Sequence, residues 1–187
     1  MIPIRNKKKT LQVTVDEMRN FAFIYVEKYA PSKQQLKTYL LKKYLRFSVS
    51  SVKKREVIDL IDIVLSDLEK DKFINDKFYS DSKAKSMIQR GNSINKIRNY
   101  LIGKGIKDEL IKSTVNKIND ENSDQDFFSA IKICKKKKIG PARTEDNRPL
   151  FYKKDISLLA RNGFDFETSK KVMDIEKEDF NKIIKLL

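Results

Sequence analysis

The sequence contains no histidine and only one cysteine, Cys134, among its 187 residues. Without histidine, the chain can form neither a zinc site of the usual kind nor a triad or acid–base pair that depends on imidazole. A single cysteine excludes a disulfide within the chain. Cys134 shares a helical face with Phe127 and Ile131, so we expect a buried thiol rather than a nucleophile. Most familiar hydrolytic mechanisms are therefore excluded.

Long hydrophobic runs are also missing. The longest, Phe21 to Val26, has six residues, whereas a membrane-spanning helix needs about 20. Basic residues near the N-terminus, Arg5 and Lys7 to Lys9, are followed by no apolar segment and no small-residue cleavage site, so they do not form a signal peptide. We therefore expect a cytoplasmic protein with no membrane contact.

Negative charge is scarce relative to positive charge. There are 41 Lys and Arg residues against 26 Asp and Glu, which gives a formal net charge of +15. This excess favours a polyanionic partner, either nucleic acid or an acidic protein surface, although a solvated lysine-rich surface has the same composition. Hydrophobic residues make up 40% of the chain, which is enough to form a core, so we do not expect disorder.

Two similar sequence segments each end an apolar helical stretch. They are Tyr100 to Ile106 and Leu158 to Phe164. Both end with a basic or amide residue, a glycine and a large apolar residue. This pattern is typical of a helix that ends in a left-handed glycine with a hydrophobic contact behind it. A degraded third copy runs from Tyr39 to Tyr44, and the copies are roughly sixty residues apart. Such spacing predicts repeated helical units.

Helical periodicity continues along the chain, with no strand-like alternation of useful length. We therefore predict an all-α fold of three tandem three-helix repeats. Capping boxes at Thr14 and Ser32 are expected to begin the first two helices. The predicted segments are a basic N-terminal tail at 1–13, a first repeat at 14–72, a second at 73–120, and a third with a C-terminal helix at 121–187.

The later repeats have weaker signals. Asn75 is the expected N-cap of the second repeat, and Phe78 is its expected first apolar anchor. In the third repeat, we expect a loop from Gly140 to about Leu150, followed by helices whose apolar residues include Phe166 and Val172.

Four stretches stand out along the chain: Tyr29 to Ser32 with Leu36, Tyr39 and Leu40; Phe73 to Phe78; Ile97 to Ile106; and Lys135 to Arg143 with Leu158 to Phe164. In this order they resemble the RecX family, the bacterial regulators of the RecA recombinase. The resemblance covers roughly residues 16 to 187. It departs from the family pattern at Lys72, where a glycine is usual, at Asn75, where an aspartate is usual, and at Tyr44, where a glycine cap is expected.

The resemblance implies tandem three-helix repeats in an elongated, curved molecule. It also implies a non-enzymatic function: binding along the groove of the RecA filament on DNA and inhibiting its ATPase, strand exchange and coprotease stimulation. No cofactor follows from the sequence, and the repeat architecture gives no reason to expect more than a monomer.

Three basic clusters are the candidate contacts for phosphates or for the filament. Four consecutive lysines on a helix point in all directions, so they suit phosphates rather than base edges. A merely solvated helix end, favoured by the helix dipole, is the alternative. If the repeats stack with similar orientation, these clusters would line up as a discontinuous basic stripe. The clusters are Lys135, Lys136, Lys137, Lys138, Arg143, Arg148, Lys153 and Lys154; then Lys42, Lys43, Arg46, Lys53, Lys54 and Arg55; then Arg90, Lys96, Arg98 and Lys104.

Other candidate groups have simpler explanations. The aromatic residues could stack on bases of a single strand, but their helical spacing favours core packing, with Phe23 the least explained. Asp59, Asp62 and Asp67 fall on different helix faces, which argues against a metal site.

Two other functions remain open. The first is a free-standing DNA-binding protein, either independent of sequence or of helix-turn-helix type, although no helix combines Arg, Asn and Gln on one face. The second is a metal-dependent nuclease, which would need clustered carboxylates that the sequence does not show.

Overall fold

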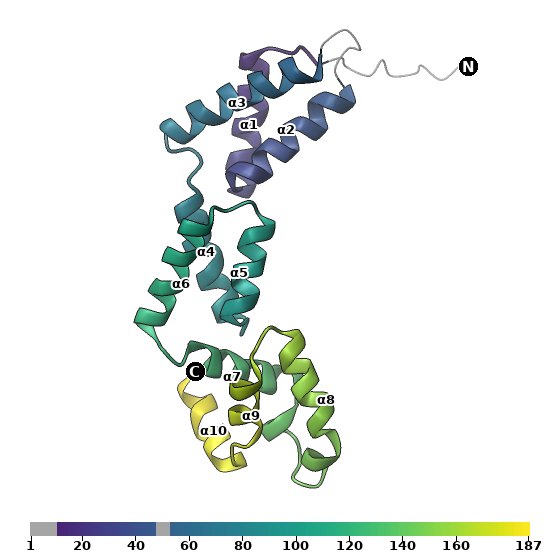
Figure 1. The fold of residues 1–187 in the computed structure, drawn as a ribbon, viewed down its shortest axis with the longest axis vertical. Helices are drawn as coiled ribbons and strands as arrows, with labels where there is room; N and C mark the ends of the chain where they lie inside the picture. Colours follow the sequence, from purple (N-terminus) through teal and green to yellow (C-terminus); the bar gives the residue numbers. More distant parts are fainter. Residues whose placement is uncertain (1–10, 48–52) are drawn as a thin grey trace, which may run out of the picture. The chain divides into compact units, whose positions relative to one another are not determined.

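The described part of the chain is helical. The computed structural model describes residues 11–47 and 53–187, and every regular element in these residues is a helix (Figure 1). This confirms the predicted all-α fold. The elements are α1 Val15–Tyr29, α2 Lys33–Phe47, α3 Lys54–Lys70, α4 Asp76–Gln89, α5 Ile94–Gly103, α6 Asp108–Glu121, α7 Gln125–Lys137, the short 3-10 helix η1 Gly140–Ala142, α8 Asn147–Arg161, α9 Phe166–Met173 and α10 Lys177–Leu186.

These residues form two compact units, which divide between Tyr79 and Ser80. The first contains α1 to α3 and the start of α4, and the second contains the remaining helices. The number of repeats, their boundaries and the shape of the array stay predictions. The predicted basic tail lies outside the described residues apart from residues 11–13, as do residues 48–52 of the basic stretch between α2 and α3.

The first unit packs its three helices around one apolar core. Because the buried positions recur every three or four residues on each helix, one face of each helix turns inward. The core residues are Met18 and Ala22 of α1; Leu36, Leu40 and Tyr44 of α2; Val57, Ile61, Val64, Leu65 and Leu68 of α3; and Ile74.

Of the two predicted capping boxes, the one at Ser32 is complete, whereas at Thr14 only the bond to the threonine is present and one carboxylate oxygen of Glu17 is buried without a hydrogen-bond partner among the described residues. The Thr14 hydroxyl accepts a hydrogen bond from the Glu17 N–H at 3.3 Å. At α2 the exchange is reciprocal: the Gln35 N–H donates to the Ser32 hydroxyl at 3.2 Å, and the Ser32 N–H donates to the Gln35 side chain at 3.1 Å. Each bond satisfies an N–H that has no partner within its helix. Asn75 caps α4 in the same way, as predicted, by accepting from the Phe78 N–H.

Both predicted glycine turns are confirmed. Gly105 has φ +72° and Gly163 has φ +89°, a region in which a side chain is strained. After each glycine, the next N–H reaches back to a carbonyl in the last helical turn, from Ile106 to Leu101 and from Phe164 to Leu159. Ile106 and Phe164 are buried, so each turn has the expected hydrophobic contact.

Two lysines adopt the same left-handed conformation without being glycine. Lys72 has φ +61° and Lys138 has φ +54°. The RecX pattern usually has glycine at the position of Lys72, and glycine adopts a positive φ without strain. Lys72 has the positive φ that such a glycine would favour, although it is not a glycine. The degraded third copy does not end a helix, because α2 continues to Phe47 and Tyr44 is fully buried within it.

Two predicted apolar anchors are wrong. Phe78 is 68% exposed and Phe166 is 70% exposed. Both lie in the first turn of their helices, where the side chain points away from the core; next to Phe78, Tyr79 is buried instead. The predicted loop after Gly140 is also shorter than expected, because α8 already begins at Asn147.

In the second unit, a close backbone contact joins the start of α5 to the turn after α8. The Ser93 hydroxyl accepts from the Lys96 N–H and donates to the carbonyl of Asn162 at 2.9 Å. Gly163 lies so close that a Cβ there would clash with this hydroxyl. The Ile94 N–H donates to Asp126 of α7 at 2.7 Å, so three segments meet at this point.

Candidate polyanion-binding surface

The predicted lysine cluster lies at the C-terminal end of α7. Lys135, Lys136 and Lys137 form the last turn of the helix, Lys138 follows in the left-handed conformation, and all four are exposed. The opposite side of α7 is buried in the core, with Ile131 and Cys134 fully covered. The four lysines therefore point into solvent at a helix end whose dipole favours positive charge.

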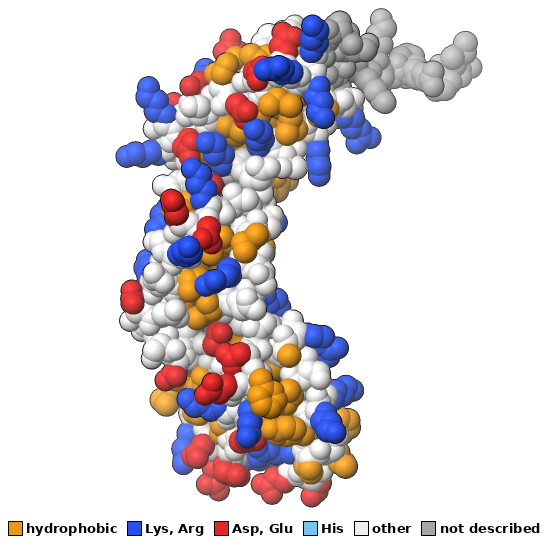
Figure 2. Space-filling model, in the orientation of Figure 1, with side chains coloured by type: hydrophobic (Ala, Val, Ile, Leu, Met, Phe, Trp, Pro, Cys, Tyr) orange, Lys and Arg blue, Asp and Glu red, His pale blue; other side chains and the backbone are white. Residues whose placement is uncertain are grey.

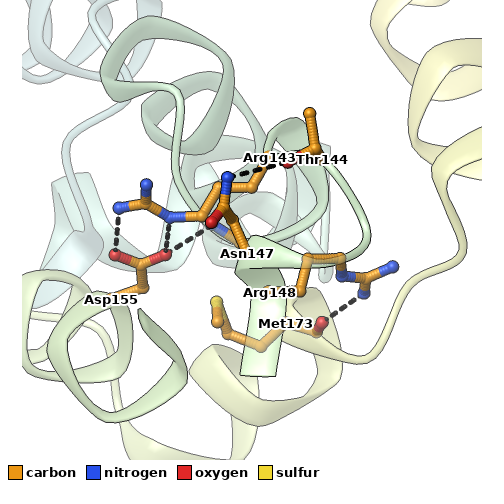
Figure 3. A network of polar contacts seen from close by, with 7 residues as sticks. Arg143, Thr144, Asn147, Arg148, Asp155 and Met173 are labelled. Carbon is orange, nitrogen blue, oxygen red and sulfur yellow. Dashed lines mark hydrogen bonds and ion pairs between the residues drawn. The ribbon is translucent and has the colours of Figure 1, made fainter. Parts of the chain in front are cut away.

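A buried carboxylate holds the turn that follows these lysines. Asp155 of α8 is only 1% exposed. It accepts the Gly140 N–H at 2.9 Å and two bonds from the Arg143 guanidinium, at 2.6 and 2.9 Å (Figure 3). Burial alone raises the pKa of Asp155, but the hydrogen bonds from Arg143 and Gly140 outweigh it and lower that pKa below its ordinary value. Asp155 is therefore charged at neutral pH, and the turn is fixed to α8.

The two arginines of this cluster make contacts inside the fold. Arg143 forms the bidentate pair with Asp155, and the pairing raises its pKa. Arg148 donates to the backbone carbonyls of Met173 and Ile175, each at 2.7 Å, at the end of α9 (Figure 3 shows the bond to Met173). Phosphate binding by these arginines stays a prediction, but the charge of Arg143 is already balanced by a carboxylate.

The remaining lysines of the cluster extend the positive field along α8. Lys153 and Lys154 are exposed. The Lys154 amine lies 5.8 Å from the centre of the Phe151 ring, and the Arg143 guanidinium lies 4.4 Å from that centre. We call Lys135 to Lys138 the lysine turn. Lys154 also helps to lower the pKa of Asp155, so it lies near the carboxylate that anchors the residues after the lysine turn.

The second predicted cluster belongs to the first unit. Lys42 and Arg46 are exposed on α2, whereas Lys43 is half-buried. The Lys43 amine lies 3.6 Å from the centre of the Phe21 ring and 5.7 Å from that of Tyr39. An aromatic ring attracts a cation without neutralising its charge.

In the third predicted cluster, Arg98 lies on α5 and Lys104 is the C-cap of that helix. Arg98 is exposed, and the half-buried Lys104 lies 5.1 Å from the centre of the Tyr100 ring. The first cluster lies in α7 and α8 of the second unit and the second lies in the first unit. A single basic stripe that joins the repeats stays a prediction.

The structure offers no grouping suited to a metal or a reactive thiol in residues 11–47 and 53–187. No three carboxylates or thiols there come together as metal ligands. Asp62 is paired with Lys37, and Asp67 with Arg19. Cys134 is fully buried, and burial, aided by the charge of Asp155, raises its pKa to about 12, so the thiolate does not form near neutral pH. The expected buried thiol is confirmed.

Asp155 is the residue that sequence reasoning missed. It lies four residues before the buried Leu159, so it shares the inward face of α8, and an acid at such a position signals a buried ion pair.

None of the described helices is long and apolar enough to cross a membrane.

No family model matches the chain. A protein of Myxococcus xanthus (strain DK1622) named "Regulatory protein RecX" is 32% identical over 177 residues, which is 91% of this chain and 91% of that protein. A protein of the same name from Agrobacterium fabrum (strain C58 / ATCC 33970) is 27% identical over 113 residues, 60% of this chain and 58% of that protein.

A solved structure gives the same fold. The crystal structure of regulatory protein RecX superposes with a TM-score of 0.60 and covers 86% of this chain and 74% of its own. At 18% identity this likeness shows the fold alone, whereas the sequence of the Myxococcus protein matches across nearly the whole chain.

Proposed function

Because the chain belongs to the RecX family of regulatory proteins, we propose that it acts on the RecA recombinase by binding the RecA filament on DNA. It inhibits the filament's ATPase, strand exchange and coprotease stimulation. Its second partner is the phosphate backbone of single- or double-stranded DNA. The chain works as a monomer, without a cofactor and without chemistry of its own.

The exposed lysine turn at the end of α7 carries this role. Lys135 to Lys138 project from a helix end whose following turn is fixed by the buried Asp155, so four charges are held together, and no carboxylate of the described residues forms an ion pair with them. Contacts to phosphates need charge more than exact geometry, and each one releases counterions from the DNA. A rigid cluster also loses less conformational entropy on binding than four lysines on a mobile loop.

Inhibition follows from a difference in affinity between filament states. A protein that binds across neighbouring protomers favours whichever filament state it binds more tightly. If that state is unsuited to nucleotide hydrolysis, ATPase activity falls in proportion to the bound fraction. Positive charge directed at DNA phosphates and at acidic groups of the groove supplies the long-range attraction.

The test compares binding to RecA filaments with binding to bare DNA. Fluorescently labelled protein is titrated with RecA filaments assembled on single-stranded DNA and with the same DNA alone. We expect tighter binding to the filament, and a large loss of both affinities when Lys135 to Lys138 are changed together to Glu. The matched control changes four other exposed lysines to Glu, namely Lys107, Lys170, Lys177 and Lys185.

The control variant has the same net charge as the test variant, so it separates a local site from general attraction. Equal losses in the two variants would remove the lysine turn from the site. Tight binding to bare DNA with no preference for the filament would favour the alternative, a free-standing DNA-binding protein.

A further inference from the structure

A ladder of aromatic rings lies along the α1/α2 seam of the first unit. Phe21, Tyr25 and Tyr29 follow one another at four-residue intervals on α1, so they share one face of the helix. Tyr39 of α2 stacks on Tyr25 with ring centres 4.0 Å apart and planes 12° apart. The ring of Tyr29 continues the ladder, 4.8 Å from that of Tyr25.

The outer end of this ladder is not needed by the core. Met18, Ala22, Leu36 and Leu40 are fully buried beneath it, whereas Tyr29 keeps 54% of its surface exposed. Tyr25 and Tyr39 are half-buried; Tyr25 packs against the ring of Tyr29, and Tyr39 stacks on Tyr25. The seam thus presents a rigid, exposed aromatic surface at the end of α1.

Positive charge accompanies the rings. The Lys28 amine lies 5.2 Å from the centre of the Tyr29 ring, and Lys43 lies over Phe21. The ion pairs Arg19–Asp67, Lys33–Glu69 and Lys37–Asp62 all run to α3, away from this seam. The carboxylate of Glu17, whose charge helps to raise the pKa of Tyr44, lies on α1 roughly three helical turns before Tyr29.

We infer that this seam binds single-stranded nucleic acid, with a base stacked on Tyr29 and the neighbouring phosphates held by Lys28 and Lys43. Surfaces that bind single strands without sequence preference combine aromatic rings with a positive field, because every base has a face that can stack. The seam has both components. On the face drawn in Figure 2, hydrophobic side chains of the first unit lie among Lys and Arg side chains and also beside some Asp and Glu side chains. A duplex offers no free base face, so the seam discriminates in favour of single strands.

The test uses the full chain without RecA, so its outcome is separate from the proposed action on the filament. A labelled oligothymidylate, an abasic strand of the same length and a duplex are titrated against wild type and Tyr29→Ala. We expect Tyr29→Ala to bind the oligothymidylate roughly five- to 150-fold more weakly. Its affinity for the abasic strand and the duplex should stay the same, because these depend on phosphates alone.

Two further variants make the result specific to the ring. Tyr29→Phe keeps the ring and should bind like wild type, whereas Phe166→Ala removes an even more exposed ring in the second unit and should have no effect. Since the chain has no tryptophan, Tyr29→Trp introduces a single indole, whose fluorescence should be quenched by oligothymidylate but not by polyglutamate.

Three results would overturn the inference. Tyr29→Ala could bind the oligothymidylate as tightly as wild type does. The fluorescence of the Tyr29→Trp variant could stay unchanged when the oligothymidylate is saturating. Polyglutamate could quench that fluorescence as strongly as the oligothymidylate does, in which case the seam takes an acidic protein segment rather than bases.

Discussion

The two units hold their charged residues in opposite ways. In the first unit the core consists of apolar side chains and Tyr44, without a buried ion pair among the described residues, and ion pairs such as Arg19–Asp67 lie at its surface with both side chains about 40% exposed. In the second unit a carboxylate, Asp155, is buried and ties together the turn after α7. The same kinds of residue therefore contribute little stability in one unit and maintain local structure in the other.

The largest expected effect comes from removing one acidic side chain from each unit and comparing the losses in stability. Asp155→Ala leaves the Gly140 N–H buried without a partner and Arg143 without its carboxylate, so we expect a loss of about 3 kcal/mol in the free energy of unfolding of the second unit. Asp67→Ala in the first unit should cost less than about 1 kcal/mol, because its pair is half in solvent. Urea denaturation monitored by circular dichroism measures both. Equal losses would contradict the comparison.

A second test concerns the glycine turn of the second unit. Gly163→Ala should cost about 1–3 kcal/mol, since the new Cβ meets a positive φ and the Ser93 hydroxyl. Gly103→Ala is the matched control. Gly103 is helical and nothing lies within 4 Å of a Cβ there, so this change should stabilise the protein by about 0.5–1 kcal/mol. Thermal unfolding of both variants checks the pair, and the same sign in both would refute the role given to Gly163.

Acid should weaken the second unit through Asp155. Its pKa is lower in the folded state, so its contribution is fully present above the ordinary aspartate value of about 3.9 and is lost as the pH falls through the lower folded value. The advantage of wild type over Asp155→Asn should therefore be constant from pH 7 to about pH 5 and shrink below about pH 4. Unfolding titrations at several pH values measure it. An advantage that grows on acidification would show that the sign is wrong.

The smallest expected effect is on the salt dependence of DNA binding. It distinguishes a lysine without a carboxylate partner from an arginine that is paired with a carboxylate. Lys43→Gln should reduce the salt dependence of binding to single-stranded DNA by about 0.7 in the slope of log K against log salt, because its charge is not balanced by a carboxylate. Arg143→Gln should leave that slope unchanged, since Asp155 already balances the charge. Anisotropy titrations at several salt concentrations resolve this difference. A larger change for Arg143→Gln would reverse the assignment.

Features set by neighbouring residues were predictable from sequence. The N-cap at Thr14, the capping box at Ser32 and the turns at Gly105 and Gly163 depend on contacts within six residues, and all four are present, although Glu17 does not complete the predicted box at Thr14. The weak apolar stripe of α4 did not fix which aromatic turns inward, and Tyr79 is buried where Phe78 was expected.

The candidate surface was predictable only in part. The exposure of Lys135 to Lys138 follows from their place at a helix end. The engagement of Arg143 and Arg148 does not, because their partners come from α8 and from the end of α9, and only the folded chain brings these together. A count of basic residues therefore overestimates the charge that is open to a partner.

The proposed function of this chain is to restrain RecA. The most direct test is RecA ATPase activity on single-stranded DNA, titrated with this protein from substoichiometric to equimolar amounts, beside an unrelated basic protein of similar charge. We predict inhibition well below equimolar amounts that the basic protein does not reproduce and that weakens when Lys135 to Lys138 are changed to Glu. Full ATPase activity at equimolar protein, despite tight binding to the DNA, would contradict the claim.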